Sequence, residues 1–371
     1  MTTLTTMRVS LVDLPARFAS IRDEILQAVA RVVDHGQFIF GPEVEALESA
    51  WAKRCDVRHA IGVADGTAAL TLVQLALGAQ SGDEILTPPN SFIASASSVA
   101  LCGATPRFVD VGDDFNIDPD RLDDAITPRT RGIIAVHLTG RPAAIDDIRR
   151  VAERRGLWVI EDAAQAFGAR SRGRPVGGLA TAGCFSLHPL KTAGVCGDAG
   201  MVTTNDDALA ERIRRLRNHG FDRRQEDCAE WGRNARLDTI QAAIGLVMLD
   251  HVDHWIDRRR ASAAIYRHRL SNVVAIPPDD PRNRCVHQTF PIESDRRDEL
   301  IDHLADRGIA AAVHYRTPIH LLKAARDLGY APGAFPRAEG QANRMLSLPI
   351  HEGLVDEDIH RVCDGIEAFF R

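Results

Sequence analysis

The chain has 371 residues, of which 45% are hydrophobic and 26% are charged, and its formal net charge is −6. This composition is typical of a soluble globular protein with a large core, and the length favours two domains. The absence of a basic block argues against a nucleic-acid partner, and no apolar run is long enough to predict a membrane span.

Cysteine and histidine spacing narrows the class further. The seven cysteines are scattered without a Cys-x-x-Cys pair, which argues against a disulfide framework and favours a reducing compartment. The 14 histidines show no His-x-x-x-His or Cys/His ligand spacing, so no metal ion is expected. The N-terminus lacks the basic and apolar segments of a signal peptide, and we expect a cytoplasmic protein.

Helices and strands alternate through the first half of the chain. Apolar residues at spacings of three and four predict two amphipathic helices, one ending near Gly36 and one centred on Leu47. Asp118-Pro119 predicts the start of another helix. Short apolar runs predict strands over 59–63, 84–87, 107–111, 132–136 and 157–161, with helices over 67–77, 91–102 and 143–155. This alternation predicts an α/β fold with a mostly parallel sheet and ligand sites at the carboxyl ends of its strands.

The pattern changes in the second half. A charged helix is predicted over 206–219, a long loop over 220–238, and a helix over 239–270 that is long enough to link two domains. Strand and helix patterns then return over 285–292, 295–306, 310–314, 346–349 and 356–370. We therefore expect a large domain over residues 1–250 and a smaller C-terminal α/β domain over 251–371, which begins within the long helix.

Two residues of the first domain indicate a cofactor. Asp162 follows a buried strand, and Lys191 ends the apolar segment Phe185-Ser186-Leu187-His188-Pro189-Leu190-Lys191, just before a Gly-rich run. Pyridoxal phosphate needs an amine for its aldehyde and an anion for its ring nitrogen. Taken singly, Lys191 could be a surface lysine in a loop, and Asp162 could be a helix N-cap.

Gly66-Thr67 follows a strand and opens a helix, where backbone N–H groups and the helix dipole favour a phosphate. A plain tight turn is the alternative. Asp65 stands directly before this pair and would repel a phosphate, so we expect its side chain to point away.

With these residues in place, the chain resembles the DegT/DnrJ/StrS family of sugar aminotransferases over nearly its whole length. The family consists of fold-type-I pyridoxal-phosphate enzymes, which resemble aspartate aminotransferase. Besides the Asp162 and Lys191 segments, the resemblance rests on Gly36-Gln37-Phe38-Ile39 with Gly41-Pro42, Gly66-Thr67-Ala68-Ala69-Leu70, Gly82-Asp83-Glu84, Ile126-Thr127-Pro128-Arg129-Thr130, Val136-His137-Leu138-Thr139-Gly140, Arg233-Asn234-Ala235-Arg236-Leu237-Asp238 and Leu346-Ser347-Leu348-Pro349.

The resemblance assigns roles around the cofactor. Lys191 matches the Schiff-base lysine, which also moves protons, and Asp162 matches the partner of the ring nitrogen. Gln165 would lie by the ring and its phenolic oxygen, and Ser186 would contact the phosphate together with Gly66 and Thr67. Phe92 would stack on the ring, although core packing is its alternative.

The resemblance also implies substrate and partner contacts. His188 would act near the substrate, where a satisfied core histidine is the alternative. Asn234 would reach the phosphate of the second subunit in a homodimer with shared active sites. Arg233 and Arg236 would meet the diphosphate of a nucleotide sugar, and Arg223 and Arg224 share their loop. His314, Tyr315 and His320 resemble the family's substrate-pocket segment.

The sequence departs from the family after the lysine, where Thr192-Ala193-Gly194 replaces Asn-Leu, and Asp198-Ala199-Gly200 lacks a second glycine. Because the resemblance places this loop beside the substrate, the departure concerns the substrate and leaves the fold and cofactor unchanged. Some relatives are dehydratases with histidine at the lysine position, so Lys191 indicates a transaminase. It would move an amino group from glutamate or glutamine to a keto-sugar, and the resemblance favours a nucleotide-linked keto-deoxysugar. A keto-cyclitol or unactivated keto-sugar is the alternative substrate, and a non-catalytic regulatory protein is the alternative class.

Overall fold

A seven-stranded sheet forms the centre of the computed structural model, which describes residues 8–222 and 226–371. Within those residues its strands are β1 (His59–Val63), β2 (Glu84–Thr87), β3 (Thr105–Phe108), β4 (Thr130–Val136), β5 (Trp158–Asp162), β8 (Ala182–Ser186) and β9 (Gly200–Thr204). Their order is β1-β9-β8-β5-β4-β2-β3, and β9 runs antiparallel to both neighbours, whereas the remaining neighbours pair in parallel.

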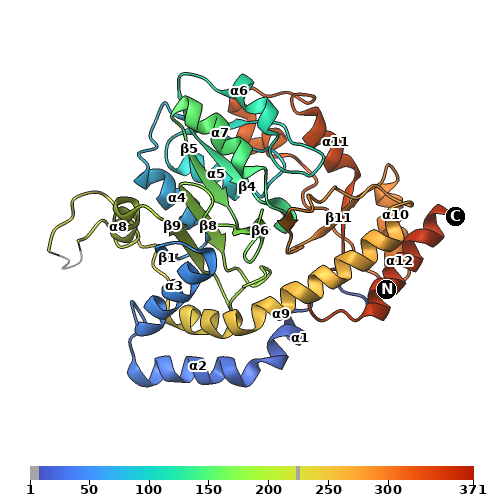
Figure 1. The fold of residues 1–371 in the computed structure, drawn as a ribbon, viewed down its shortest axis with the longest axis horizontal. Coiled ribbons are helices and arrows are strands. Elements are labelled where there is room, and N and C mark those ends of the chain that lie inside the picture. Colours follow the sequence, from blue (N-terminus) through green and yellow to red (C-terminus); the bar gives the residue numbers. More distant parts are fainter. Residues whose placement is uncertain (1–7, 223–225) are drawn as a thin grey trace.

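Helices cover both faces of this sheet (Figure 1). On one face lie α3 (Pro42–Cys55), α7 (Ile145–Arg155) and α9 (Thr239–Leu270), with α2 (Arg22–His35) packed against α9 (Figure 1). On the other face lie α4 (Gly66–Ala76), α5 (Ala94–Leu101) and α8 (Asp207–Leu216). Alternate residues of β4 divide between the two hydrophobic clusters: Ile133 and Ala135 join the first, and Ile134 and Val136 join the second. A strand buried on both faces explains the continuous apolar runs of the sequence.

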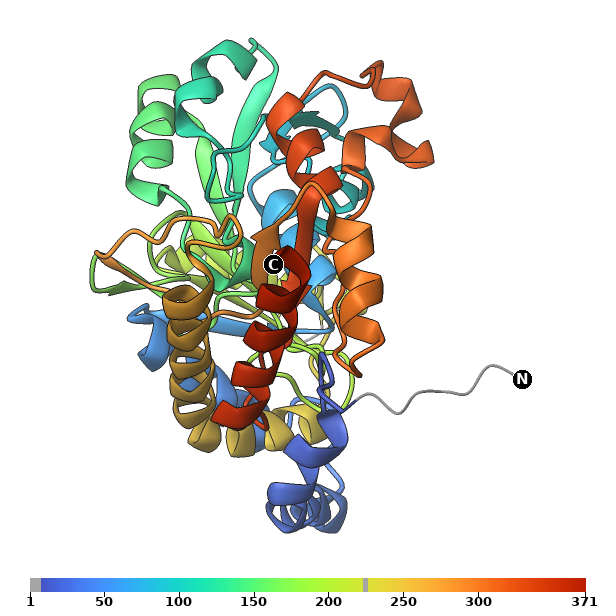
Figure 2. The same cartoon turned by 90° about the vertical axis from the view of Figure 1, so that its right-hand side faces the viewer.

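A smaller unit is built around the antiparallel pair β11 (Phe290–Glu293) and β12 (Met345–Leu348). Its core contains residues of α10 (Arg297–Ala305), of α12 (Asp356–Phe370) and of the C-terminal half of α9, beside which α12 lies (Figure 2). Val9 joins the same core, so the N-terminal segment packs against the C-terminal part of the chain.

Short elements complete the described chain. They are α1 (Leu14–Ser20), α6 (Leu122–Ala125), α11 (Pro336–Arg344), a small sheet of β6 (Arg170–Ser171), β7 (Arg174–Pro175) and β10 (Asn283–Arg284), and 3₁₀ turns over Pro119–Arg121, Leu138–Gly140, Ile319–Leu321 and Lys323–Leu328.

The predicted α/β class with a mostly parallel sheet is confirmed, and some elements differ. Residues 310–314 were expected as a strand, but only Ala312 bridges to Ser347. The Asp118-Pro119 signal starts a 3₁₀ turn that leads into the short α6, and the Asp118 side chain accepts a hydrogen bond from the Asp120 N–H, as a cap does. Helix α9 runs without a break through residue 250, and the domain boundary near that position stays a prediction.

Among the described helices, none is both long and apolar enough to cross a membrane.

Candidate active site

Asp162, the last residue of β5, lies at the carboxyl end of the sheet with only 6% of its surface exposed. Ser95, near the start of α5, donates a hydrogen bond of 2.7 Å from Oγ to Asp162 Oδ2. The Ala164 N–H donates to the other carboxylate oxygen at 3.3 Å. Both contacts fix the direction of the carboxylate. Sequence reasoning missed Ser95.

Lys191 lies half-buried in the turn that follows β8. Burial lowers the pKa of its amine, and the negative charge of Asp162 acts in the opposite direction. Burial also lowers the pKa of His314, and the charge of Lys191 lowers it further. Lys191 therefore lies within electrostatic range of both Asp162 and His314. The three residues come from three separate segments of the chain.

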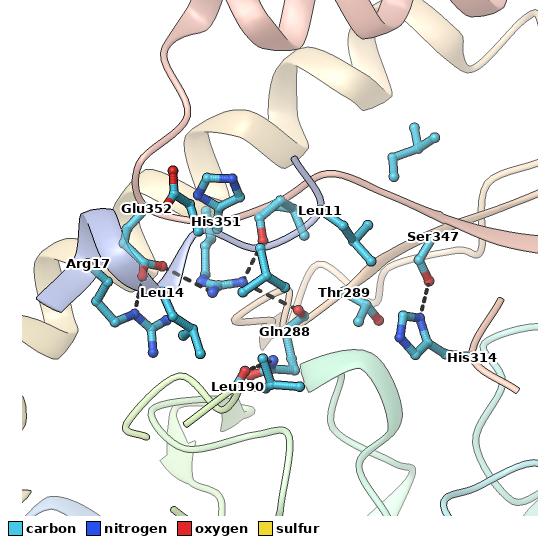
Figure 3. A pocket seen from close by; sticks show the side chains of 15 residues that line it. Leu11, Leu14, Arg17, Leu190, Gln288, Thr289, His314, Ser347, His351 and Glu352 are labelled. Atoms are coloured by element: carbon cyan, nitrogen blue, oxygen red, sulfur yellow. Dashed lines mark hydrogen bonds and ion pairs between the residues drawn. The ribbon is translucent and has the colours of Figure 1, made fainter. Parts of the chain in front are cut away.

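Beside the lysine turn lies a small cavity of about 80 Å³ (Figure 3). Leu190 borders it on one side, and His314, whose Nδ1 is 3.0 Å from Ser347 Oγ, borders it on another. Gln288 and the buried Arg17 also line it. The cavity thus lies between the turn that carries Lys191 and the smaller unit, and Gln288 contacts the turn at the cavity's edge.

Tyr315, Gln165 and Phe92 form a second group in the site. Burial together with the charge of Asp162 raises the pKa of the Tyr315 hydroxyl to about 12, and the nearby Gln165 side chain acts in the opposite direction. The Gln165 carbonyl oxygen accepts from the Thr139 N–H at 2.7 Å. Phe92 is 54% exposed, and its ring centroid lies 5.9 Å from that of Tyr315. The exposed Phe92 ring therefore lies next to the phenol of Tyr315, which stays protonated at neutral pH.

Gly66 and Thr67 open helix α4 as expected, and Ser186 at the end of β8 lies against them. A Cβ added to Gly66 would come within 2.9 Å of the Ser186 Cβ, so only glycine permits this close approach. The Asp65 side chain caps the helix and accepts from the Ala68 N–H at 2.8 Å, and its direction relative to a bound phosphate stays a prediction. The N–H groups of Gly66 and Thr67 precede that bond, in the turn where a helix offers them no intrahelical partner.

Some candidates lie at the edge of this group. His188 is exposed, and its Nδ1 accepts from the Leu190 N–H at 3.3 Å within the turn. Its catalytic role stays a prediction.

The loop candidates lie on a segment that runs beside the end of β1. The Ala64 N–H donates to the Ala235 carbonyl at 3.0 Å, and Arg236 donates to Asn218 Oδ1 at 3.0 Å. Asn234 and Arg233 are exposed there. Arg223 and Arg224 lie outside the described residues.

His320 is not brought together with the other candidates. It is 2% exposed, its Nε2 is 3.1 Å from Glu339 Oε1, and its ring packs 4.7 Å from that of Phe335. His320 is therefore a buried core histidine whose Nδ1 finds no hydrogen-bond partner among the described residues. Substrate contact by His320 stays a prediction.

The residues brought together fit pyridoxal phosphate. The first turn of α4, packed against Ser186, offers the N–H groups of Gly66 and Thr67 to a phosphate. A buried, hydrogen-bonded carboxylate suits the ring nitrogen, and a partly buried amine suits the aldehyde. In the part of the chain that the structure describes, no group of three or more His, Cys, Asp or Glu is arranged for a metal ion. Fold and site together define a fold-type-I pyridoxal-phosphate enzyme.

Comparison with known proteins specifies the family. The chain belongs to the DegT/DnrJ/EryC1/StrS aminotransferase family, whose family model matches residues 19–367. It is 42% identical over 367 residues to the dTDP-3-amino-3,4,6-trideoxy-alpha-D-glucose transaminase of Streptomyces venezuelae, with 98% of this chain and 97% of that protein covered. It is also 42% identical to the erythromycin biosynthesis sensory transduction protein EryC1 of Saccharopolyspora erythraea, with 98% and 100% covered.

Solved structures agree with the family. The crystal structure of S. venezuelae DesV in complex with a ketimine intermediate matches with a TM-score of 0.96 and 42% identity, covering 99% of each chain. Bacillus subtilis NtdA with bound PMP matches with a TM-score of 0.92 and 29% identity, covering 100% of this chain and 87% of that one. The protein is a pyridoxal-phosphate-dependent aminotransferase, as the resemblance implied.

Proposed function

We propose that this aminotransferase moves an amino group from glutamate or glutamine to the ketone of a nucleotide-linked keto-deoxysugar. The observation that carries the proposal is the electrostatic proximity of Lys191 and Asp162 at the strand ends, in a chain of this family. The named S. venezuelae relative, a transaminase of a dTDP-linked trideoxyglucose, supports this class of substrate.

The residues of the site divide the chemistry. Bound pyridoxal phosphate would supply a ring that withdraws the electron pair released at the substrate carbon. Asp162 would keep a proton on the ring nitrogen, and Ser95 would keep the carboxylate directed toward it. Lys191 Nζ would hold the cofactor between turnovers and carry a proton to and from the substrate carbon. Because burial lowers its pKa, this amine gives up its proton more readily than a solvated lysine does.

We propose a homodimer with shared sites. Phe38, Ile39 and Phe40 are 46%, 41% and 36% exposed, and Trp231 is 95% exposed. The Thr239 N–H, at the end of the 220–238 loop, donates to the Phe38 carbonyl, so one end of the loop and the apolar segment lie together. A second copy would bury this apolar surface. By the resemblance, Asn234 would then contact the cofactor phosphate of that copy.

In such a dimer, Arg233 and Arg236 are the candidates for the sugar diphosphate. Arg233 is exposed and Arg236 is half-buried, and a guanidinium can make charge-assisted, bidentate contacts to phosphate. Arg236 also donates to Asn218 in its own chain, which holds its guanidinium in one direction. Loss of either arginine should cost about 1.5–3 kcal/mol of sugar binding, the range for hydrogen bonds to charged groups.

Paired half-reactions test the substrate. Loss of the cofactor absorbance band with glutamate and its return with the keto-sugar are followed separately in Arg233→Ala and Arg236→Ala. The proposal expects a raised KM for the nucleotide-linked keto-sugar and an unchanged glutamate half-reaction. Equal damage to both halves would assign these arginines to structure or to the cofactor phosphate. Equal rates with a free keto-cyclitol and with the nucleotide sugar would favour the alternative substrate.

A regulatory protein on the same fold is the second reading, and the name of the EryC1 relative favours it. Binding alone needs neither the proton-transfer amine nor the buried carboxylate, and Lys191 and Asp162 are both present. Turnover in the half-reactions decides between the two. We further propose a cytoplasmic location, since all seven cysteines are free.

A further inference from the structure

We propose that Gln288 and Thr192 are positioning residues for Lys191. The Thr192 hydroxyl donates to Gln288 Oε1 at 2.9 Å, and Gln288 Nε2 donates to the Leu190 carbonyl at 2.6 Å. The amide therefore holds the residue before the lysine and the residue after it. This inference rests on the proposed role of Lys191.

Gln288 is itself anchored by a closed chain of contacts that returns to the lysine. Arg259 donates to the Gln288 carbonyl at 3.3 Å and to Glu352 Oε2 at 3.1 Å. Glu352 also pairs with Arg17, whose Nη1 donates to the Lys191 carbonyl at 3.0 Å. Arg17 and Arg259 are 5% and 3% exposed, so water competes little for these contacts. Figure 3 shows Arg17, Glu352 and Gln288 of this arrangement around the cavity.

The position of the lysine turn matters because Lys191 Nζ would have to reach both the cofactor and the substrate carbon. Proton transfer requires the donor and acceptor to approach to hydrogen-bond distance, and small misplacements are costly in rate. The lysine turn is held from outside the sheet, by Arg17 of α1 and by Gln288, which lies just before β11 of the smaller unit. Thr192, which departs from the family pattern, is 2% exposed, and its hydroxyl finds its hydrogen-bond partner in Gln288 inside the protein.

The test compares Thr192→Val, Thr192→Ser and Gln288→Ala in the holoenzyme. Thr203→Val is the matched control, because the Thr203 hydroxyl is equally buried and donates to the Gly177 carbonyl at 2.6 Å, away from the lysine turn. Three quantities are measured: thermal stability, turnover per bound cofactor, and the midpoint of the substrate-free pH titration of the cofactor absorbance band. The titration needs no sugar, so it separates this inference from the choice of substrate.

Thr192→Val and Gln288→Ala should slow both half-reactions by the same factor, about five- to tenfold, with KM values unchanged. Their titration midpoints should move away from that of the wild type. Thr192→Ser should stay within about twofold because it keeps the donor, and Thr203→Val should lose only thermal stability.

Two results would overturn the inference. One is a titration midpoint and a turnover in Thr192→Val and Gln288→Ala that match those of Thr203→Val. The other is slowing confined to the sugar half-reaction, which would make these residues substrate contacts. Gln288 is half-buried, so Gln288→Ala keeps the test available if Thr192→Val fails to fold. A wild-type protein that never shows a Lys191-linked band would remove the proposed function itself.

Discussion

The Ser95 hydroxyl lies 2.7 Å from Asp162 Oδ2, although the two residues are 67 positions apart. Asp162 is nearly inaccessible to water, so this donor replaces part of the hydration that the carboxylate loses on folding. Hydrogen bonds to charged groups contribute more than neutral ones, about 1.5–3 kcal/mol. The Ser95 hydroxyl therefore holds the Asp162 carboxylate in one direction.

Ser95→Ala should lower turnover about tenfold while the protein still folds and binds cofactor, because the carboxylate loses one of its two orienting donors. Ser95→Thr should restore most of the rate, since it keeps the hydroxyl. Ser98→Ala is the control: Ser98 lies on the same helix, is fully buried and accepts from Gln74 Nε2 at 2.9 Å. Steady-state kinetics on cofactor-loaded protein check this, and equal losses in Ser95→Ala and Ser98→Ala would contradict it.

Truncation of Asp162 should mainly reduce activity, whereas truncation of its neighbour Glu161 should mainly reduce stability. Asp162→Ala should reduce transamination by on the order of 10²–10³-fold, because the charge that supports the ring is lost. Glu161, on the other face of β5, is fully buried and accepts from the N–H groups of Gly177 and Leu179 at 2.9 and 2.8 Å. Glu161→Ala should therefore cost stability, about 3 kcal/mol or more.

Urea unfolding and turnover, measured on both variants, separate these two effects. Near-normal turnover in a folded, cofactor-loaded Asp162→Ala protein would remove Asp162 from the mechanism.

Lys191 can be tested cleanly because the chain has only two other lysines, Lys53 and Lys323. Borohydride treatment should attach the cofactor to the peptide that contains Lys191, because only this amine is brought to the site. Lys191→Ala should bind cofactor, if at all, without covalent linkage and lose turnover. Lys53→Arg and Lys323→Arg should keep both the yellow colour and the label, as mass spectrometry of the digested protein would record. Label on another lysine would refute the assignment.

The sequence predicted the sheet well where strands are buried on both faces. The runs in β4 and β5 are continuously apolar and flanked by helical patterns, so their type was clear. Residues 200–204 follow a Gly-rich run and pair antiparallel with both neighbours, and nothing local predicted β9. The expected strand over 310–314 failed because that segment makes one bridge only, at Ala312.

Some residues of the site have a local sequence signal and others do not. Asp162 and Lys191 stand out locally, since a charge at the end of an apolar run is unusual. Ser95 lies in a stretch of small residues, and its importance comes only from a partner distant in sequence. Gln288 is likewise ordinary until the fold places it beside Thr192.

Subunit mixing tests the shared site. If Asn234 serves the neighbouring site, a dimer of one Lys191→Ala and one Asn234→Ala subunit has one site with both lesions and one intact site. Random mixing should then recover about a quarter of wild-type activity, since half of the dimers are mixed. Lys191→Ala mixed with Asp162→Ala is the control and should recover none, because both lesions lie in the subunit's own site. A fully active monomer in sedimentation experiments would contradict the shared site.

Glu352 should make stability depend on pH in acid. Its carboxylate lies between Arg17 and Arg259, and although burial alone would raise its pKa, these cations lower it from 4.5 to about 2. Between those values the unfolded chain takes up a proton that the folded chain does not. Stabilisation is therefore fully present above about pH 4.5 and is lost as the pH falls toward 2. At about 1.4 kcal/mol per pKa unit, the effect is on the order of 3 kcal/mol.

Glu352→Gln should lower the free energy of unfolding at pH 7 by about 3–5 kcal/mol, because it leaves two buried guanidinium groups without their anion. The gap between wild type and variant should narrow as the pH falls from 4.5, since protonation removes the same charge from the wild type. Urea unfolding at a series of pH values measures this. Glu299→Gln is the control, because Glu299 pairs with Arg296 at the surface, where both side chains are more than half exposed. Such a pair contributes at most about 1 kcal/mol. A loss of stability in Glu299→Gln as large as that in Glu352→Gln would contradict the assignment. So would a difference between wild type and Glu352→Gln that stays constant down to pH 2.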